Sequence, residues 1–166
     1  MTQMPEIILV AHNIRSTHNI GSLFRTAEGF GVSHIICSGY TPYPTTDGDQ
    51  RLPHIRDRLT SQIHKTALGA EQLVPFTYYP DPPLEKLRSQ GYSVVGLEQA
   101  GHSVPLNSYT PPKRIALLIG EEVAGISAEL IHACDDIIEI PMFGQKESFN
   151  VSVATGIALY ALTTSQ

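Results

Sequence analysis

Short apolar runs alternate along the chain with segments in which apolar residues recur at helical spacing. This alternation is typical of βαβ units, whose strands are almost continuously apolar because helices cover both faces of the sheet. We expect strands at Ile7–Ala11, His34–Ser38, Leu73–Phe76 (a weak one), Tyr92–Leu97, Ile115–Ile119 and Ile137–Ile140. The pattern therefore predicts an α/β fold with a mostly parallel sheet and helices on both faces.

Helices are predicted between these strands. The first begins at Asn19, whose side chain can cap a helix, and ends at the glycines of Gly29–Gly31. A second follows the prolines of Pro82–Pro83 and closes within Lys86–Gln90. The apolar face of the first helix is made of Ile20, Leu23, Phe24, Ala27 and Phe30.

The C-terminal third predicts two more helices. Ser127 can cap a short one over Leu130, Ile131 and Ala133. The last helix begins at Ser148 or Asn150, where a polar loop gives way to apolar residues at helical spacing. Those residues are Val151, Ala154, Ile157, Ala158 and Leu162.

The segment Tyr40–Leu59 does not fit this alternation, because it is polar and rich in Pro, Asp and Gly. It predicts a long loop, and long loops within compact domains are usually functional. The sequence contains no internal repeat and no low-complexity linker. We therefore expect residues 1–166 to form a single domain.

Charge is unevenly distributed along the chain. The net charge of −5 argues against indiscriminate binding to nucleic acid. Residues 1–66 nevertheless hold six Lys and Arg against five acids, whereas residues 67–166 hold five against eleven. A polyanion would therefore approach the N-terminal portion, although ordinary variation in surface charge explains the same numbers.

The remaining composition points to the cytoplasm and away from metals. Cys37 and Cys134 lie far apart, each within an apolar run, as expected of reduced thiols. The N-terminus does not read as a signal peptide, and no apolar stretch reaches the roughly 20 residues of a membrane helix. The histidines are not clustered with cysteines and carboxylates, so we expect no metal site.

Known nucleotide-binding patterns are not met. The closest candidate for a dinucleotide fingerprint, Gly29–His34, lacks the third glycine and precedes a predicted strand instead of following one. The phosphate-loop pattern that ends in Gly-Lys-Ser/Thr does not occur. Neither nicotinamide nor triphosphate chemistry has local support.

Three other segments concentrate polar residues at the ends of predicted elements. NIGSLFRTAEGFG (19–31) places Asn19 six residues before Arg25. This spacing alone does not require a function, because Asn19 can cap the helix and Arg25 can be a solvated side chain. IALLIGEEVAGIS (115–127) follows a buried strand with Gly120 and two acids, of which one is favourable at a helix start without any other function.

The third segment, IPMFGQKESFNVSVA (140–154), leaves a strand through Pro141, turns at Gly144, and enters a helix. Strand-to-helix junctions are common ligand sites in α/β proteins, because strand-end carbonyls and helix-start N–H groups face one crevice. Each of the three segments is therefore a candidate small-molecule site.

Together the three segments resemble, in order, the three signature motifs of the SpoU (TrmH-like) family of RNA ribose 2′-O-methyltransferases, in the SPOUT superfamily. The matching positions are Asn19, Arg25, Ala27, Phe30 and Gly31, then Gly120, Glu122 and Gly125, then nearly all of Ile140–Ala154. The departures are Glu121, Val123 and Phe149. KTALGAE (65–71) and GLE (96–98) also resemble this family, so the likeness covers almost the whole chain, as in minimal, catalytic-domain-only members.

The resemblance implies a specific activity. It implies methyl transfer from S-adenosylmethionine to a ribose 2′-hydroxyl of tRNA or rRNA, by a homodimer whose C-terminal chain forms a deep trefoil knot. The implied cofactor contacts are Leu97, Gly120, Ile140, Met142 and Ser148. Arg25 is the implied catalytic arginine, and the implied residues that hold Arg25, the loops and the ribose are Asn19, Glu122, Ser148 and Asn150.

Two alternatives stay open from the sequence. One is a base methyltransferase on the related knotted fold, which would carry a different motif set in place of the pair Asn19 and Arg25. The other is a non-catalytic RNA-binding module. RNA recognition is expected at the Tyr40–Leu59 loop, with Arg51, Arg56 and Arg58. The sequence does not specify which RNA or which nucleotide is modified.

Overall fold

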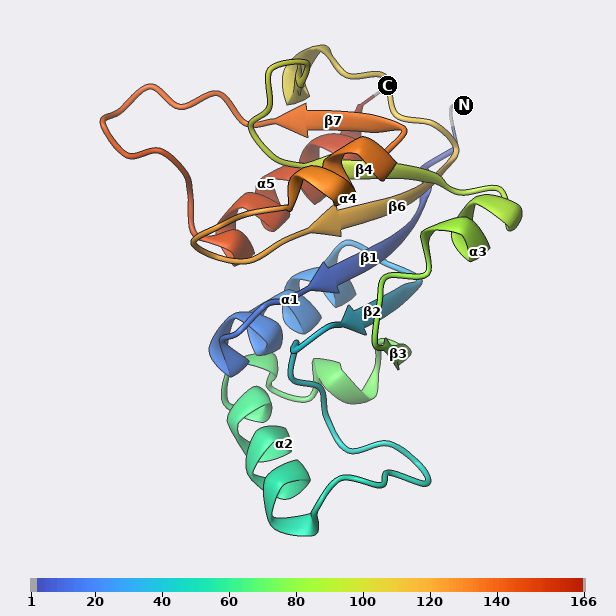
Figure 1. Cartoon of the computed structure of the whole chain (residues 1–166), viewed down its shortest axis with the longest axis vertical. Coiled ribbons are helices and arrows are strands. Elements are labelled where there is room, and N and C mark those ends of the chain that lie inside the picture. Colours follow the sequence, from blue (N-terminus) through green and yellow to red (C-terminus); the bar gives the residue numbers. More distant parts are fainter. Residues whose placement is uncertain (1–2, 166) are drawn as a thin grey trace.

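The computed structural model describes residues 3–165. Their core is one seven-stranded sheet of order β3-β2-β1-β6-β4-β7-β5, in which every pair of neighbouring strands is parallel (Figure 1). The strands are β1 (Glu6–His12), β2 (His34–Ser38), β3 (Phe76–Tyr79), β4 (Ser93–Leu97), β5 (Val104–Pro105), β6 (Arg114–Ile119) and β7 (Asp136–Glu139). The helices are α1 (Thr17–Gly29), α2 (Pro53–Ala67), α3 (Leu84–Ser89), α4 (Ala128–Ala133) and α5 (Val151–Thr164). Short 3₁₀ turns, η1 (Ala70–Gln72) and η2 (Leu106–Ser108), follow α2 and β5.

The two central strands show why the strands are continuously apolar. Leu9 of β1 and Leu117 of β6 belong to the cluster that also buries residues of α1 and α5. Their neighbours Val10 and Leu118 belong to the opposite cluster, with α3 residues and Leu130 of α4. Because side chains alternate between the faces of a strand, a sheet with helices on both sides needs apolar residues at every position. The predicted α/β fold with a mostly parallel sheet is confirmed.

Helices α1 and α2 pack at very short distance. A Cβ atom built on Gly21 of α1 would lie 2.0 Å from Thr66 Oγ1 and 2.3 Å from the carbonyl oxygen of Ile63, both on α2. Only glycine permits this approach. The Thr66 hydroxyl also donates to the carbonyl oxygen of His18, 2.8 Å away, which ties the two helices together. Helix α2 is thereby fixed beside the start of α1.

Several sequence predictions need correction. The long loop expected over Tyr40–Leu59 ends at Leu52, since α2 begins at Pro53. Proline is favourable in the first turn of a helix, because the backbone N–H that it lacks would have no partner within the helix there. The weak strand expected at Leu73–Phe76 lies three residues later, at β3. The short edge strand β5 was not predicted.

The predicted helix N-caps are wrong for α1 and correct for α4 and α5. Asn19 is not the N-cap of α1, since the Ser16 side chain accepts a hydrogen bond from the Asn19 backbone N–H. Ser127 caps α4, as predicted. For the last helix, of the two candidates, Asn150 is the N-cap.

The β4–β5 connection passes around the end of β7. Leu97 of β4 and Val104 of β5 both pair with Ile138, one from each side of β7. Residues 98–103 must therefore cross from one side of β7 to the other, and Figure 1 shows this segment bending around the tip of the β7 arrow. The segment that leaves β7 then swings out before it enters α5. Among the described residues, no helix is long and apolar enough to cross a membrane.

Candidate active site

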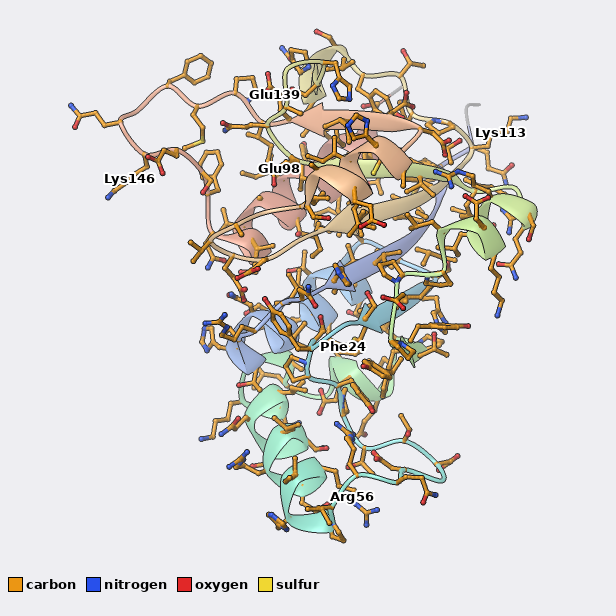
Figure 2. All side chains as sticks on the ribbon, viewed as in Figure 1. Phe24, Arg56, Glu98, Lys113, Glu139 and Lys146 are labelled. Carbon is orange, nitrogen blue, oxygen red and sulfur yellow. The ribbon has the colours of Figure 1, made fainter. Side chains whose placement is uncertain are left out.

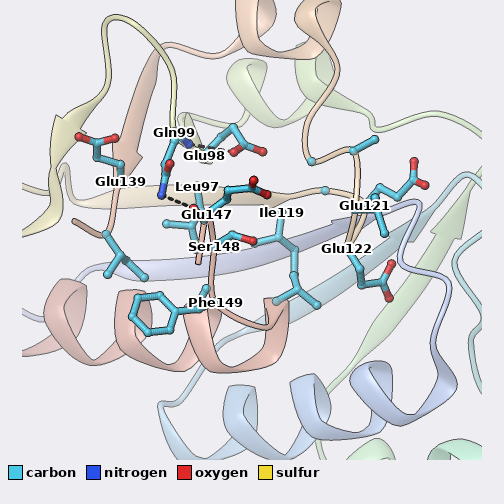
Figure 3. A pocket seen from close by; sticks show the side chains of 17 residues that line it. Leu97, Glu98, Gln99, Ile119, Glu121, Glu122, Glu139, Glu147, Ser148 and Phe149 are labelled. Carbon is cyan, nitrogen blue, oxygen red and sulfur yellow. Dashed lines mark hydrogen bonds between the residues drawn. The ribbon is translucent and has the colours of Figure 1, made fainter. Parts of the chain in front are cut away.

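A cavity of about 290 Å³ lies at the carboxyl edge of the sheet, where four chain segments meet (Figure 3). Its wall is formed by the end of β4, the loop after β6, the end of β7, and the start of α5 with the residues before it. The lining residues are Leu97–Gln99, Ile119–Gly125, Glu139, Ile140, Glu147–Phe149, Val151 and Ala154. Parallel strands place their ligand sites at this edge.

Glu122 joins the cavity wall to the start of α1. Its carboxylate accepts hydrogen bonds from the backbone N–H groups of Arg15 (3.2 Å) and Ser16 (3.1 Å) and from Asn19 Nδ2 (3.2 Å). Burial alone would raise the pKa of Glu122, but the N–H groups outweigh it, with that of Ser16 foremost, so the pKa lies below its usual value. Glu122 is therefore a carboxylate at neutral pH.

Asn19 and Asn150 continue this network into the third segment. Asn19 is buried, and its Oδ1 accepts a hydrogen bond from Asn150 Nδ2 at 3.3 Å. The Oδ1 of Asn150 in turn accepts from the backbone N–H of Ser152 at 3.0 Å, which caps α5. The side chains of Glu122, Asn19 and Asn150 thus connect residues more than a hundred positions apart and fix α1, the β6 loop and α5 around one cavity.

The loop after β6 is folded tightly against β4. A Cβ atom on Gly120 would lie 2.7 Å from the carbonyl carbon and oxygen of Gly125. Gly125 has a φ of +70°, which side chains rarely adopt, and it packs on the carboxylate of Glu98. Glu98 also accepts the backbone N–H of Ile126 at 3.0 Å. The sequence did not single out Glu98 itself, although the segment GLE that contains it was noted.

The cavity combines an apolar wall with an acidic rim. Leu97, Ile119 and Ile140 supply aliphatic surface, and Phe149 adds an aromatic ring that is 40% exposed. Five carboxylates surround this wall, as Figure 3 shows: Glu98, Glu121, Glu122, Glu139 and Glu147. The lining therefore suits a ligand with an apolar ring at one part and positive charge at another.

The structure brings together most of the residues that the sequence selected. Of the expected cofactor contacts, Leu97, Gly120, Ile140 and Ser148 line the cavity, whereas Met142 is half-buried outside the lining. Of the expected catalytic residues, Glu122 and Ser148 line it, and Asn19 and Asn150 lie behind Glu122 through the hydrogen bonds above.

Arg25 is placed differently from the rest. Its side chain is exposed on α1, and it does not line the cavity. Six residues of α-helix correspond to about 600° of rotation, so Arg25 points roughly 120° away from Asn19. The buried Asn19 joins the hydrogen-bond network behind the cavity, and Arg25 therefore lies on a different face of α1 from this network. Within residues 3–165, no group of three His, Cys, Asp or Glu side chains is arranged to hold a metal ion.

Comparison with known families gives a consistent result. The sequence profile of the SpoU rRNA Methylase family matches residues 6–160. The chain is 30% identical over 158 residues to a tRNA (guanosine(18)-2′-O)-methyltransferase of Aquifex aeolicus, covering 93% of this chain and 67% of that protein. It is 32% identical over 158 residues to the 23S rRNA (guanosine-2′-O-)-methyltransferase RlmB of Nitrosomonas europaea, covering 94% of this chain and 55% of that protein.

Solved structures agree with the sequence comparison. The AdoMet-bound rRNA methyltransferase of Sinorhizobium meliloti superposes with a TM-score of 0.77 at 26% identity, over 96% of this chain and 56% of that one. The TrmH/SpoU tRNA modifying enzyme of A. aeolicus superposes with a TM-score of 0.76 at 26% identity, over 97% and 75%. The chain thus spans between about half and three quarters of the length of these relatives.

Proposed function

The chain belongs to the SpoU rRNA Methylase family, and from this premise we propose that it transfers a methyl group from S-adenosylmethionine to a ribose 2′-hydroxyl of tRNA or rRNA. The observation that carries the proposal is the network of Glu122, Asn19 and Asn150, which joins the three signature segments around one cavity. We expect residues 1–166 to act as one SpoU-type methyltransferase domain.

The cavity fits the proposed cofactor in chemistry. Its aliphatic wall of Leu97, Ile119 and Ile140 suits adenine, and its carboxylates offset the positive charges of a sulfonium and an ammonium group. When bound, S-adenosylmethionine supplies an already activated methyl group. We therefore assign Leu97, Gly120, Ile140 and Ser148, which line the cavity, to cofactor binding. Met142 lies outside the lining, two residues after Ile140, and stays a predicted contact.

The task left to the protein is to position the ribose and to stabilise its oxygen. Correct positioning of two reactants can lower a barrier by on the order of 7–11 kcal/mol. The guanidinium of Arg25 donates hydrogen bonds to a substrate phosphate or to the developing alkoxide, and the proton of the 2′-hydroxyl leaves to a phosphate oxygen or water. Glu122, Asn19 and Asn150 hold the loops that place the ribose.

The position of Arg25 supports a homodimer with shared active sites. Because Arg25 is exposed and does not line the cavity of its own chain, we propose that it serves the cavity of a second subunit. The surface beside it is apolar: Val153, Ile157 and Tyr160 of α5 are 50%, 37% and 62% exposed, and they border a hollow that Phe30 of α1 also lines. This face of α1 and α5 is the proposed dimer interface.

We also propose that the chain forms the deep trefoil knot that its family resemblance implies. The crossing of residues 98–103 around β7, between Leu97 and Val104, supports this topology. The two free and widely separated cysteines, Cys37 and Cys134, support action in a reducing cytoplasm.

Nucleoside mass spectrometry tests the reaction. The purified protein is incubated with S-adenosylmethionine and with total tRNA or rRNA from a strain that lacks it. We expect a new 2′-O-methylated nucleoside in one of the two RNA pools. A methylated base in place of a methylated ribose would support the alternative base methyltransferase. Failure of the protein to bind S-adenosylmethionine in titration calorimetry would support a non-catalytic RNA-binding module.

Mixing two inactive variants tests the shared site. Arg25→Ala should abolish methylation while the dissociation constant for S-adenosylmethionine changes by less than about twofold. Gly120→Val should displace the loop that walls the cavity and so impair cofactor binding, because its side chain would clash with the backbone of Gly125. If Arg25 acts across a dimer, an equal mixture of the two variants should recover roughly a quarter of wild-type activity. Half of the dimers then contain one subunit of each variant, and in each of these dimers one of the two sites combines an intact cavity with an intact Arg25.

A mixture that stays inactive, although light scattering shows that subunits exchange, would contradict the shared site. Leu97→Trp, which fills the cavity from another wall, replaces Gly120→Val if that variant does not fold.

A further inference from the structure

A second hollow, of about 460 Å³, lies beside the candidate active site and is lined by aromatic and arginine side chains. Its main residues are Arg15, Tyr40, Tyr43, Arg51 and Tyr78. None of them belongs to the three signature segments or takes part in the proposed reaction. Rings and guanidinium groups at one surface are the side chains on which unpaired nucleobases stack.

Part of the hollow is a preformed stack. The rings of Tyr43 and Tyr78 lie 4.5 Å apart at 19°, and the guanidinium of Arg51 lies 3.7 Å from the centroid of Tyr43. The Tyr78 hydroxyl donates to the carbonyl oxygen of Gly39 at 2.7 Å. These three side chains form a stack that is already held in place at one side of the hollow.

Tyr40, in contrast, offers its ring to solvent. It is 49% exposed, and the guanidinium of Arg15 lies 5.9 Å from its centroid, on a side chain that is 79% exposed. Tyr40 therefore presents an aromatic surface with a movable cation next to it.

The backbone that carries Tyr40 is fixed to the end of the sheet. Its N–H donates to Asn13 Oδ1 at 3.1 Å, directly after β1. The adjacent Thr41 is 2% exposed, and its hydroxyl donates to the carbonyl of Ala11 and accepts from the N–H of Ile14, both at 3.0 Å. Gly39, with a φ of +66°, packs against Asn13 so closely that no side chain fits there. Because this backbone is already fixed, binding at Tyr40 requires little ordering of the main chain.

The hollow and the active-site cavity share a wall. The backbone N–H of Arg15 donates to Glu122, and its guanidinium lies 3.7 Å from Glu121. Both glutamates line the cavity. A nucleotide next to the one whose ribose meets the methyl donor at this cavity would therefore reach Tyr40 and Arg15.

The charge distribution favours this approach. Five carboxylates around the cavity repel a polyanion, so RNA must enter past the cations beside it. Arg15 is one, and the adjoining helix α2 carries Arg56, Arg58 and Lys65 against the single acid Asp57. Figure 2 shows Arg56 on α2, at the end of the molecule away from Lys113.

We propose that this hollow binds the base of an RNA nucleotide that flanks the methylated one, with the base stacked on Tyr40 and its phosphate bound by Arg15. The proposal rests on the proposed function, and it defines the substrate as RNA with an unpaired base beside the target ribose.

Tyr40→Ala tests the stacking. With total tRNA or rRNA from a strain that lacks the protein, we expect the KM for RNA to rise about tenfold, which is the usual effect of losing one stacked base. The kcat should change by less than about twofold, and affinity for S-adenosylmethionine should not change. Tyr40→Phe keeps the ring and should behave like the wild type. Thermal melting of each variant checks that it is folded.

Arg15→Ala tests the phosphate contact, with Lys113→Ala as its matched control. Lys113 is an exposed cation at the amino end of β6, at the opposite edge of the sheet. Arg15→Ala should weaken RNA binding and lower the slope of log affinity against log salt by about one. Lys113→Ala should leave that slope unchanged, and so should Tyr40→Ala, because stacking releases no counterions.

The outcomes separate this proposal from the proposed function. A wild type that methylates RNA, together with Tyr40→Ala and Arg15→Ala variants of unchanged KM, overturns the base site alone. A loss of kcat without a change in KM would also overturn it. A wild type that neither binds nor methylates either RNA pool overturns both.

Discussion

Two loops lie at the carboxyl edge of the sheet, residues 40–52 and residues 141–149, and they are built in opposite ways. In residues 40–52, Asp49 and Arg51 form a nearly buried ion pair at 2.6 Å, with side-chain exposures of 2% and 19%. The Arg51 guanidinium also donates to the carbonyl oxygens of Tyr43 and Pro44. In residues 141–149, Phe143 is 98% exposed. The hydrogen bond from Gln99 Nε2 to the carbonyl oxygen of Glu147 joins this second loop to the segment that follows β4.

The difference teaches which polar residues the fold itself requires. Arg51 was expected to contact RNA, but its donors are occupied by its own loop, so its first role is structural. The loop 141–149 carries the most specific signature of the chain and is largely exposed. Packing within the chain does not account for its residues, and this is a reason for our proposal that they bind a ligand.

The largest expected effect on stability comes from the first loop. Asp49→Asn leaves the Arg51 charge without its partner and should lower the free energy of unfolding by about 2–3 kcal/mol, measured by urea denaturation. The Arg51 guanidinium holds the pKa of Asp49 well below its usual range. The ion pair therefore contributes to the free energy of unfolding above the pKa of an unfolded aspartate, near 4, and this contribution is lost as the pH falls below that value.

Glu147→Gln is the matched control in the second loop, since it also replaces a carboxylate by an amide. Glu147 is exposed, so we expect a change within about 0.5 kcal/mol. Equal losses in the two variants would show that the loops do not differ in this way.

Glu122 is the intermediate case, because it lines the cavity and also holds the start of α1. Glu122→Gln should cost about 1–2 kcal/mol of unfolding free energy, as expected for weakened hydrogen bonds to a charged group. The pKa of Glu122 is lowered, so its contribution is present above the pKa of an unfolded glutamate and fades on acidification. The variant should accordingly show a flatter decline in stability between about pH 5 and pH 3. An unchanged acid profile would mean that Glu122 does not stabilise α1.

The smallest effect on stability is expected at Ser148, which is exposed and lines the cavity. Ser148→Ala should change the unfolding free energy by less than about 0.5 kcal/mol. It should weaken S-adenosylmethionine binding about fivefold in titration calorimetry, the effect of one lost hydrogen bond. Ser61→Ala, an exposed serine of α2, should change neither quantity. A destabilised Ser148→Ala with normal cofactor affinity would contradict the contrast between the loops.

Elements with strong local patterns could be predicted from the sequence, and those that depend on distant partners could not. The strand His34–Ser38 was predicted to the residue, because its apolar run is bounded by polar residues and glycine. Helix α2 was missed, because its only buried residues are Ile63 and Ala67 and the rest of its length looks like a polar loop. Its partner is the flat surface at Gly21, which only the folded chain reveals.

In the candidate site, too, local patterns could be predicted and distant partners could not. The three signature segments identified Glu122, Asn19 and Asn150, but local spacing gave Asn19 the wrong role, as a helix cap. Its actual partners lie 103 and 131 residues away in the chain, where no periodicity can indicate them. Likewise, the exposure of Arg25 follows from the rotation of α1 about its axis, which packing on α2 and α5 fixes.

The strand order also affects how the protein is made. Strand β1 lies at the centre of the sheet, between β2 and β6, yet β6 ends at Ile119, about 80 residues after β2. At a synthesis rate of 5–20 residues per second, the growing polypeptide waits about 4–16 s for this partner. Until then β1 keeps an open apolar edge outside the ribosome, which is the surface that a chaperone would protect during translation.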